Sequence, residues 1–279
     1  EGEILYMDIS NANNNTDKAI GTIIHEFQHL INYNYVISGE RNEMSSWLNE
    51  ALSESTSILF NKTTAESRIN EFNNINYYCF YTWNAPKQEI SNGSSNIVNS
   101  LFNYPSASVF MHWLYQKNNS NETIFKTIAS SKELGDYNKV LSAAKGISGY
   151  SVSSWDSLLL DWMSEIVTNG SNWTTTNKPT NNCASGDVSL YPGAMIVCDS
   201  CSNSGTSANI VTTNINNGKS KTIILNKDTT LGKGATSVKV SVSSTSSKAR
   251  MSRSIRNDNN EESRDINILL DRNGNIKKD

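Results

Sequence analysis

Two histidines and a glutamate, His25, Glu26 and His29, stand together in the pattern H-E-x-x-H. Residues four apart on a helix lie on the same face, one turn apart, so both imidazoles can reach one metal ion. Neutral imidazole nitrogen suits zinc, and a carboxylate beside the metal can accept a proton from a water molecule that zinc has made more acidic. Because the chain has only 3 histidines in 279 residues, chance alone gives this pattern in on the order of a few such chains per thousand. The pattern predicts a zinc-binding helix with Glu26 as a general base.

The sequence around this pattern favours a helix. Apolar residues recur at three- and four-residue steps, which places them in one stripe. Thr16 or Asp17 has the side chain of a helix N-cap. We expect the stripe to be buried in a core while the histidines face a cleft on the opposite side. The stripe consists of Ile20, Ile23, Ile24, Phe27, Leu30 and Ile31.

A catalytic zinc site normally has three protein ligands and one open position, so two histidines leave one ligand to be found. A third histidine at the spacing H-E-x-x-H-x-x-G-x-x-H is absent, since Asn32 and Tyr35 occupy the places of its glycine and its histidine. The remaining candidates are acidic and lie further along the chain. They are Glu40, Glu43, Glu50 and Glu54.

The segment Trp47–Glu54 has the pattern of a second helix, opened by Ser45 or Ser46. Glu50 and Glu54 are four residues apart and therefore share a face of this helix. One of them can bind the metal while the other accepts a hydrogen bond from the outer nitrogen of a ligand histidine, as metal-bound histidines usually require.

The sequence H-E-F-Q-H-L-I-N at residues 25–32, followed by W-L-N-E at 47–50, resembles the glutamate-zincin metallopeptidases, the group that includes thermolysin and the zinc aminopeptidases. It is most similar to the hyicolysin family of secreted bacterial neutral metallopeptidases. The resemblance covers roughly residues 1–167 and is strongest over 20–60. It implies that Glu50 is the third zinc ligand and that Glu54 orients the first histidine. The 20 residues between His29 and Glu50 are slightly more than in the best-known members.

A second region of similarity concerns the residue that, in these peptidases, stabilises the oxyanion formed when water attacks the peptide carbonyl. Tyr104 and Pro105 are expected to open a helix, with the proline in its first turn. The segment resembles a region of the zinc aminopeptidases in which a tyrosine just before such a helix has this role, which Tyr104 would inherit. His112 is the alternative donor, because thermolysin-like enzymes use a histidine.

The predicted fold class is α+β, with a zincin-like, mostly helical catalytic domain over residues 1–167 that lacks upstream strands, followed by a small all-β module. A polar segment at 168–182 has the composition of a linker. Short alternating segments over 183–245 predict the β-rich module. The charged residues 246–279 are expected to form a flexible tail. Within the catalytic domain, further helices are expected from Thr63 to about Phe72 and over 121–131, 136–145 and 153–167.

The chain has four cysteines, Cys79, Cys183, Cys198 and Cys201, of which three belong to the predicted β module. In an exported protein these favour one disulfide, from Cys183 to Cys198 or to Cys201. The spacing Cys198-x-x-Cys201 leaves a structural metal site as the alternative.

The net charge of −3 gives no reason to expect a nucleic-acid partner. No apolar run approaches transmembrane length and no signal peptide opens the chain. Because only 24 residues precede His25 and the first is Glu1, we expect a fragment or processed form from which upstream strands and an export signal are missing. The expected location is secreted or cell-surface, and the expected partners are protein or peptide substrates.

These observations predict a zinc-dependent endopeptidase. A zinc aminopeptidase is the nearest alternative, although the G-x-M-E-N motif of that family is absent before His25. A catalytically silent surface-binding protein on a zincin scaffold is the alternative from another class. The presence of Glu26 argues against it, because binding alone needs no base.

Overall fold

The computed structural model describes residues 16–40, 42–60, 62–80, 100–168, 173, 175–199, 201–203, 207–216, 220–231 and 234–244. All of these belong to one compact unit, Glu1–Ser246. Within them, no helix is both long enough and apolar enough to cross a membrane. The expected tail at 246–279 lies outside the described residues.

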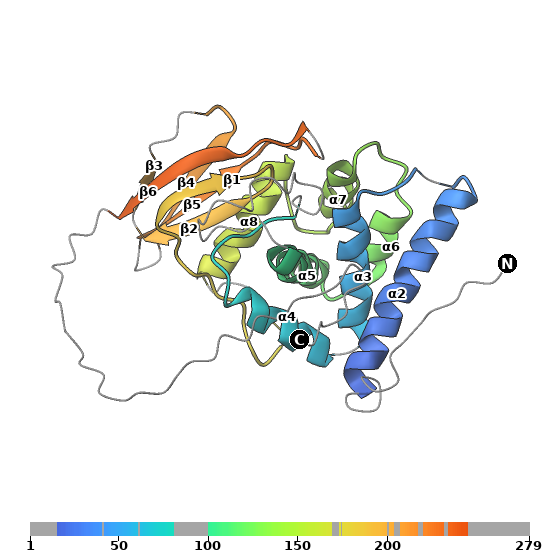
Figure 1. Cartoon of the computed structure of the whole chain (residues 1–279). Coiled ribbons are helices and arrows are strands. Elements are labelled where there is room, and N and C mark those ends of the chain that lie inside the picture. The colour runs from blue at the N-terminus through green and yellow to red at the C-terminus, as the bar shows by residue number, and fades with distance from the viewer. Residues whose placement is uncertain are drawn as a thin grey trace, which may run out of the picture. The chain divides into compact units, whose positions relative to one another are not determined.

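Helices make up the first part of the described chain and antiparallel strands the last part (Figure 1). This confirms the mixed α+β class, whereas the zincin arrangement stays a prediction. The helices are α2 (Thr16–Ile37), α3 (Ser46–Phe60), α4 (Lys62–Phe72), α5 (Ser100–Lys117), α6 (Thr123–Ala129), α7 (Asp136–Lys145) and α8 (Trp155–Thr168). The strands are β1 (Gly186–Leu190), β2 (Met195–Asp199), β3 (Cys201–Asn203), β4 (Ile210–Asn216), β5 (Ser220–Asn226) and β6 (Val238–Ser244).

An aromatic cluster holds the helical part together around α5. The ring of Phe110 on α5 lies 5.0 Å from that of Phe80, 5.4 Å from Trp162 and 5.9 Å from Trp113. Each of these four side chains is at most 1% exposed. Aromatic rings bury large apolar areas and pack in such offset and edge-to-face arrangements, so they supply much of the apolar stabilisation here.

Two three-stranded antiparallel sheets, in the orders β2-β5-β4 and β1-β6-β3, complete the described unit. Successive residues of a strand point to opposite faces. On β5, Ile223 and Leu225 therefore join the core of the helices, where β5 contacts α8, while Ile224 faces Leu190 and Val240 of the second sheet. Figure 1 shows the sheets stacked beside α8. The helical core thus continues into the strands.

The expected linker at 168–182 is attached to α4 in its described part. Glu66 accepts a hydrogen bond from the backbone N–H of Asn177 at 2.9 Å, and Asn73 accepts one from Thr180 at 2.7 Å. The division of the chain into a catalytic domain and a separate β module stays a prediction. In the structure the helices and strands share one core, and the expected linker is hydrogen-bonded to the helical part.

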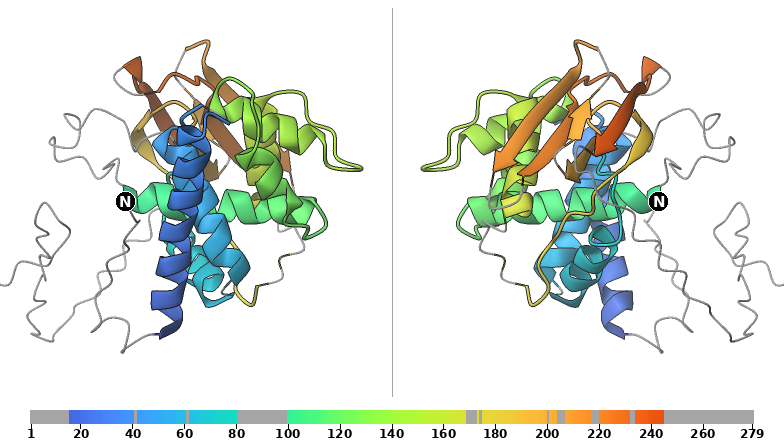
Figure 2. Two further views of the ribbon diagram at one scale, coloured as in Figure 1. Left: turned by 90° about the vertical axis from the view of Figure 1, so that its right-hand side faces the viewer. Right: turned by 90° about the vertical axis from the view of Figure 1, so that its left-hand side faces the viewer.

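The predicted burial of the apolar stripe on α2 is wrong, because none of its six residues is buried. Ile23 is 40% exposed and Phe27 55% exposed, and only Gly21 and Asn32 are buried on this helix. The reason is that α2 meets α3 and α4 through its histidine face, where α3 offers matching hydrogen-bonding groups. Figure 2 shows α2 (blue) as the outermost helix on its side. Periodicity identified the stripe but not what covers it.

The predicted start of the helix at Tyr104 is also wrong. Helix α5 begins at Ser100, so Pro105 lies inside it and Tyr104 within its second turn. Pro105 is the sixth residue of α5, beyond the four whose N–H groups have no partner within a helix, so its missing N–H leaves one helical hydrogen bond unmade.

Cys183 does not form the predicted disulfide. It is a free thiol whose Sγ lies 3.1 Å from Nζ of Lys221, whereas Cys198 is disulfide-bonded. The alternation of side chains along β2 explains this. Lys221 contacts both Cys183 and, at 2.7 Å, Asp199, so Cys183 lies on the same face of the sheet as Asp199. Cys198 directly precedes Asp199 on β2, so its side chain points to the opposite face.

Candidate metal centre

Helices α2 and α3 bring three of the predicted site residues together. The Nε2 atom of His25 lies 3.2 Å from Nε2 of His29 and 3.1 Å from Oε2 of Glu50, and Nε2 of His29 lies 3.6 Å from the same oxygen. Among the described residues, these three form the group of His, Cys, Asp and Glu side chains whose ligand atoms are close enough to hold a metal ion. Glu40 and Glu43, the earlier acidic candidates, are exposed and not part of this group.

The spacing of the three donor atoms fits tetrahedral zinc. With metal–ligand bonds of about 2.1 Å, neighbouring ligand atoms on a tetrahedron are about 3.4 Å apart. The three observed distances, 3.1, 3.2 and 3.6 Å, lie on either side of that value. Two imidazoles and a carboxylate also form a donor set that zinc accepts, and they leave the fourth position of a tetrahedron open.

The electrostatics of the group favour a positive charge at its centre. Burial alone would lower the pKa of His25, but hydrogen bonds with Glu50 and Glu54 raise it to about 9. Burial alone would raise the pKa of Glu50, but hydrogen bonds with His25 and His29 lower it to about 2. At neutral pH a proton on His25 meets this preference, and a metal ion that binds here must displace that proton.

The outer nitrogen of each histidine has a partner on α3. Nδ1 of His25 lies 3.3 Å from Oε1 of Glu54, the residue expected to orient this ring, and Nδ1 of His29 lies 3.1 Å from Oγ of Ser53. Partners of this kind fix the ring orientation and the tautomer, so that Nε2 keeps its lone pair for a metal. Ser53 was missed because a lone serine on a helix carries no spacing signal.

Polar contacts along the α2–α3 interface set the register of the two helices. Asn32 on α2 donates to Oδ1 of Asn49 on α3 at 2.6 Å, and Thr56 on α3 donates to Oε1 of Gln28 at 3.0 Å. Near the start of α2, the hydroxyl of Ser57 donates to the carbonyl of Gly21 at 2.9 Å. A Cβ atom on Gly21 would lie 3.0 Å from Oγ1 of Thr64, so glycine permits the close approach.

The start of α3 is held by α7. The carboxylate of Asp136 accepts a hydrogen bond from the backbone N–H of Ser45 at 2.6 Å, while Nζ of Lys139 lies 2.8 Å from its other oxygen. The carbonyl of Ser45 accepts the N–H of Leu48, which begins the helix as the sequence predicted. Glu50 is thereby placed one turn inside a fixed helix end.

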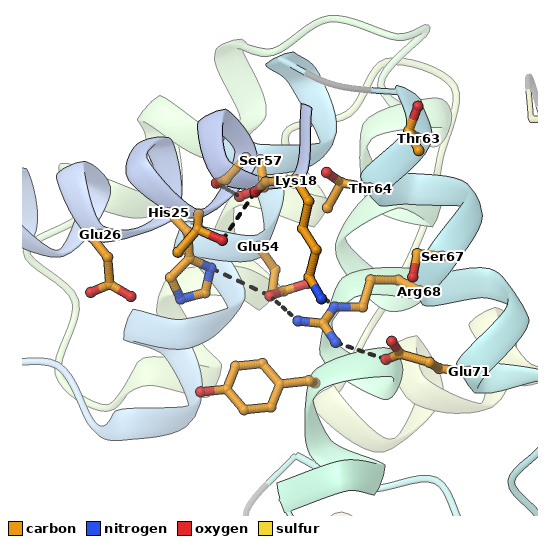
Figure 3. Close-up of a pocket in the computed structure, with 13 residues that line it drawn as sticks. Lys18, His25, Glu26, Glu54, Ser57, Thr63, Thr64, Ser67, Arg68 and Glu71 are labelled. Atoms are coloured by element: carbon orange, nitrogen blue, oxygen red, sulfur yellow. Dashed lines mark hydrogen bonds and ion pairs between the residues drawn. The ribbon is translucent and has the colours of Figure 1, made fainter. Parts of the chain in front are cut away.

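A cavity of about 490 Å³ opens beside His25, and Figure 3 shows the side chains around it. Glu26 follows His25 on α2, is exposed and lines this cavity, as does Tyr104 from α5. The ring of Tyr104 lies 6.3 Å from that of His25. Burial and the Glu50 carboxylate raise the pKa of Tyr104, so its hydroxyl stays a donor at neutral pH.

His112 lies elsewhere on α5, two turns beyond Tyr104. It is 4% exposed, its ring lies 5.1 Å from that of Trp173 and 6.2 Å from that of Tyr115, and it does not line the cavity. Burial lowers its pKa to about 4. The structure thus brings Tyr104, and not His112, to the cavity beside His25.

Arg68 on α4 is a residue of the site that the sequence interpretation missed. Its Nε and Nη2 atoms donate to the two oxygens of Glu54 at 2.7 and 2.8 Å. Burial alone would raise the pKa of Glu54, but hydrogen bonds from His25 and Arg68 lower it. One feature of the sequence could have drawn attention to it: Arg68 is the sole arginine between residues 42 and 249.

Comparison with known proteins adds one observation. No protein-family model matches the chain, and no solved structure matches it. The neutral metalloprotease ShpI of Staphylococcus hyicus is 28% identical to it over 141 residues, which cover 46% of this chain and 30% of that protein. The chain therefore spans less than a third of the length of this curated relative. With the geometry of the metal centre, this similarity supports a relationship to metallopeptidases.

Proposed function

We propose that the chain carries the active centre of a secreted zinc-dependent endopeptidase of the hyicolysin type. The observation that carries the proposal is the spacing of the three donor atoms of His25, His29 and Glu50, which matches a tetrahedral zinc site with one open position. The similarity to a neutral metalloprotease supports the same reaction class. The resemblance of residues 25–32 to secreted enzymes supports export, and protein or peptide chains are the proposed substrates.

A zinc ion bound here would supply a Lewis acid and lower the pKa of a water molecule at the open position. The chain's own residues would do the rest. Glu26, one residue from His25 and lining the same cavity, accepts the proton of the attacking water and later delivers it to the leaving amine. Tyr104 donates its hydroxyl proton in a hydrogen bond to the oxyanion. Glu54 and Ser53 keep the two imidazoles oriented.

The test is digestion of casein and of a peptide with both ends blocked, using wild-type protein and the Glu26→Gln variant. We expect zinc content to be equal in the two proteins, with turnover lower by about 10²–10⁴-fold in the variant. A chelator should abolish wild-type activity and added zinc restore it. Wild-type turnover in Glu26→Gln would refute the mechanism, and activity confined to peptides with a free amino terminus would favour an aminopeptidase.

The role of Tyr104 is tested by Tyr104→Phe, which keeps the ring and removes the hydroxyl. Losing one oxyanion donor should lower turnover by about 10²-fold or more while zinc content hardly changes. His112→Ala is the matched comparison and should leave turnover per folded molecule unchanged. A large loss in His112→Ala, with Tyr104→Phe unaffected, would transfer the role to the histidine.

A further inference from the structure

Arg68 contacts three groups at once beside the metal centre. Its guanidinium forms a two-point ion pair with Glu54, a third contact of 2.7 Å with Glu71, and its Cζ atom lies 5.1 Å above the centre of the Tyr104 ring. Figure 3 shows it between Glu54 and Glu71 on the wall of the cavity. It comes from α4, which contributes no ligand atom to the group of His25, His29 and Glu50.

The contact with Glu54 determines where a buried carboxylate points. The side chain of Glu54 is only 2% exposed, and Arg68 takes both of its oxygens while Oε1 also faces Nδ1 of His25. A planar guanidinium bound at two points fixes the rotation of a carboxylate, which a single ammonium group cannot do. The orientation of the His25 ring therefore depends on Arg68 through Glu54.

The contact with Tyr104 concerns the other functional group of the site. An arginine within about 6 Å of an aromatic ring centre and over its face is attracted to that face. Arg68 meets this condition, so the same side chain that orients Glu54 also holds the phenol ring. Glu71, whose side chain is 46% exposed, binds the outer nitrogen and is the partner furthest from the site.

We propose that Arg68 is a positioning residue that couples the metal centre to the oxyanion donor: it holds Glu54 against His25 and the ring of Tyr104 beside the same cavity. The part that concerns Tyr104 rests on the proposed function. The part that concerns Glu54 requires only that the group binds zinc.

The first experiment measures zinc affinity by competition with a chromogenic chelator, which needs no turnover. Arg68→Met and Arg68→Lys should each weaken zinc binding by about 10–100-fold, as expected for loss of the group that supports a ligand histidine. Glu71→Gln is the matched control, since it removes only the outer contact, and should stay within about threefold of wild type. Circular dichroism checks that each variant is folded, and Arg68→Lys, which keeps the charge, decides the question if Arg68→Met does not fold.

A double variant separates a positioning role from general damage. If Arg68 acts through Glu54, adding Arg68→Met to Glu54→Gln should weaken zinc binding by less than about threefold beyond Glu54→Gln alone, because residues that act through one contact are not additive. Because the double variant removes both charges of the Arg68–Glu54 pair, it leaves neither partner as an unpaired charge. In the same way, with zinc added to saturation, Arg68→Lys should lower kcat with KM little changed, and should lower it by a smaller factor in a Tyr104→Phe background than in the wild type.

The outcomes distinguish this proposal from the proposed function. Zinc binding within about threefold of wild type in folded Arg68→Lys, or full additivity with Glu54→Gln, would overturn the positioning role even if the protein is an active peptidase. Weakened zinc binding in Arg68→Lys, in a protein that cleaves no peptide, would support the role at Glu54 and reject the peptidase.

Discussion

The two faces that α3 presents to its neighbours are built on opposite principles. Toward α2 the interface is polar: Asn49, Ser53 and Thr56 of α3 hydrogen-bond with side chains of α2. Glu50 and Glu54 of α3 both contact His25. Toward α5 and the core it is aromatic, with Trp47 stacked 6.0 Å from Phe80. The polar interface fixes the orientation of the site's side chains but contributes less to stability than an apolar interface would. The aromatic core supplies the stability that the site requires.

The largest effect on stability is expected in the aromatic core. Phe80 is 1% exposed and its ring contacts those of Trp47, Phe110 and Trp162. Phe80→Ala should lower the free energy of unfolding by about 3–5 kcal/mol, since it removes a large apolar side chain and leaves a cavity. Urea denaturation monitored by circular dichroism measures it. A loss below about 1 kcal/mol would mean that this cluster is not the main source of stability.

A smaller loss is expected at the polar interface. Asn32 is 4% exposed, donates to Asn49 and accepts from Gln28 at 3.0 Å. Asn32→Ala removes both of these hydrogen bonds at a buried position and should cost about 1–3 kcal/mol. Asn34→Ala, at an exposed position of the same helix, is the control and should change little. Equal effects of the two changes would show that the interface is not formed as described.

The two regions should also differ in their response to pH, because each contains a histidine with a shifted pKa. In the metal-free protein the pKa of His25 is raised to about 9, so its contribution to stability is complete below pH 6.5 and is lost as the pH rises toward 9. The pKa of His112 is lowered to about 4, so its contribution is complete above pH 6.5 and is lost as the pH falls toward 4.

Denaturation with a chelator present, at pH 4.5, 6.5 and 9, checks both signs. His25→Gln should flatten the curve above pH 6.5, and His112→Gln should flatten it below. The opposite assignment would contradict the described environments. Because zinc must displace the proton of His25, the apparent zinc affinity should also rise with pH up to about 9.

The smallest effect is expected at Phe27, which is the same residue type as Phe80 in the opposite surroundings. With its side chain 55% exposed, Phe27→Ala should change the free energy of unfolding by less than about 0.5 kcal/mol. A loss close to that of Phe80→Ala would show that this face of α2 is covered in solution. It would then support the burial of Phe27 that the sequence predicted.

The sequence was most informative where spacing alone implies geometry. The four-residue steps from His25 to His29 and from Glu50 to Glu54 predicted which side chains share a face, and the structure brings the two faces together. The stripe of α2 shows the limit, because its period identifies a face without saying what lies against it. Arg68 and Ser53 were missed for the same reason, since their roles follow from the packing of separate helices.

Zinc content of purified variants tests the central claim most directly. After dialysis against zinc-free buffer, the wild type should retain about one zinc ion per chain. Glu50→Ala should retain less than about a tenth of that amount, because the site then has two protein ligands. Glu43→Ala, an exposed acidic position that the sequence also allowed as a ligand, should retain as much as the wild type. Full zinc in Glu50→Ala, or its loss in Glu43→Ala, would contradict the assignment of His25, His29 and Glu50 as the metal centre.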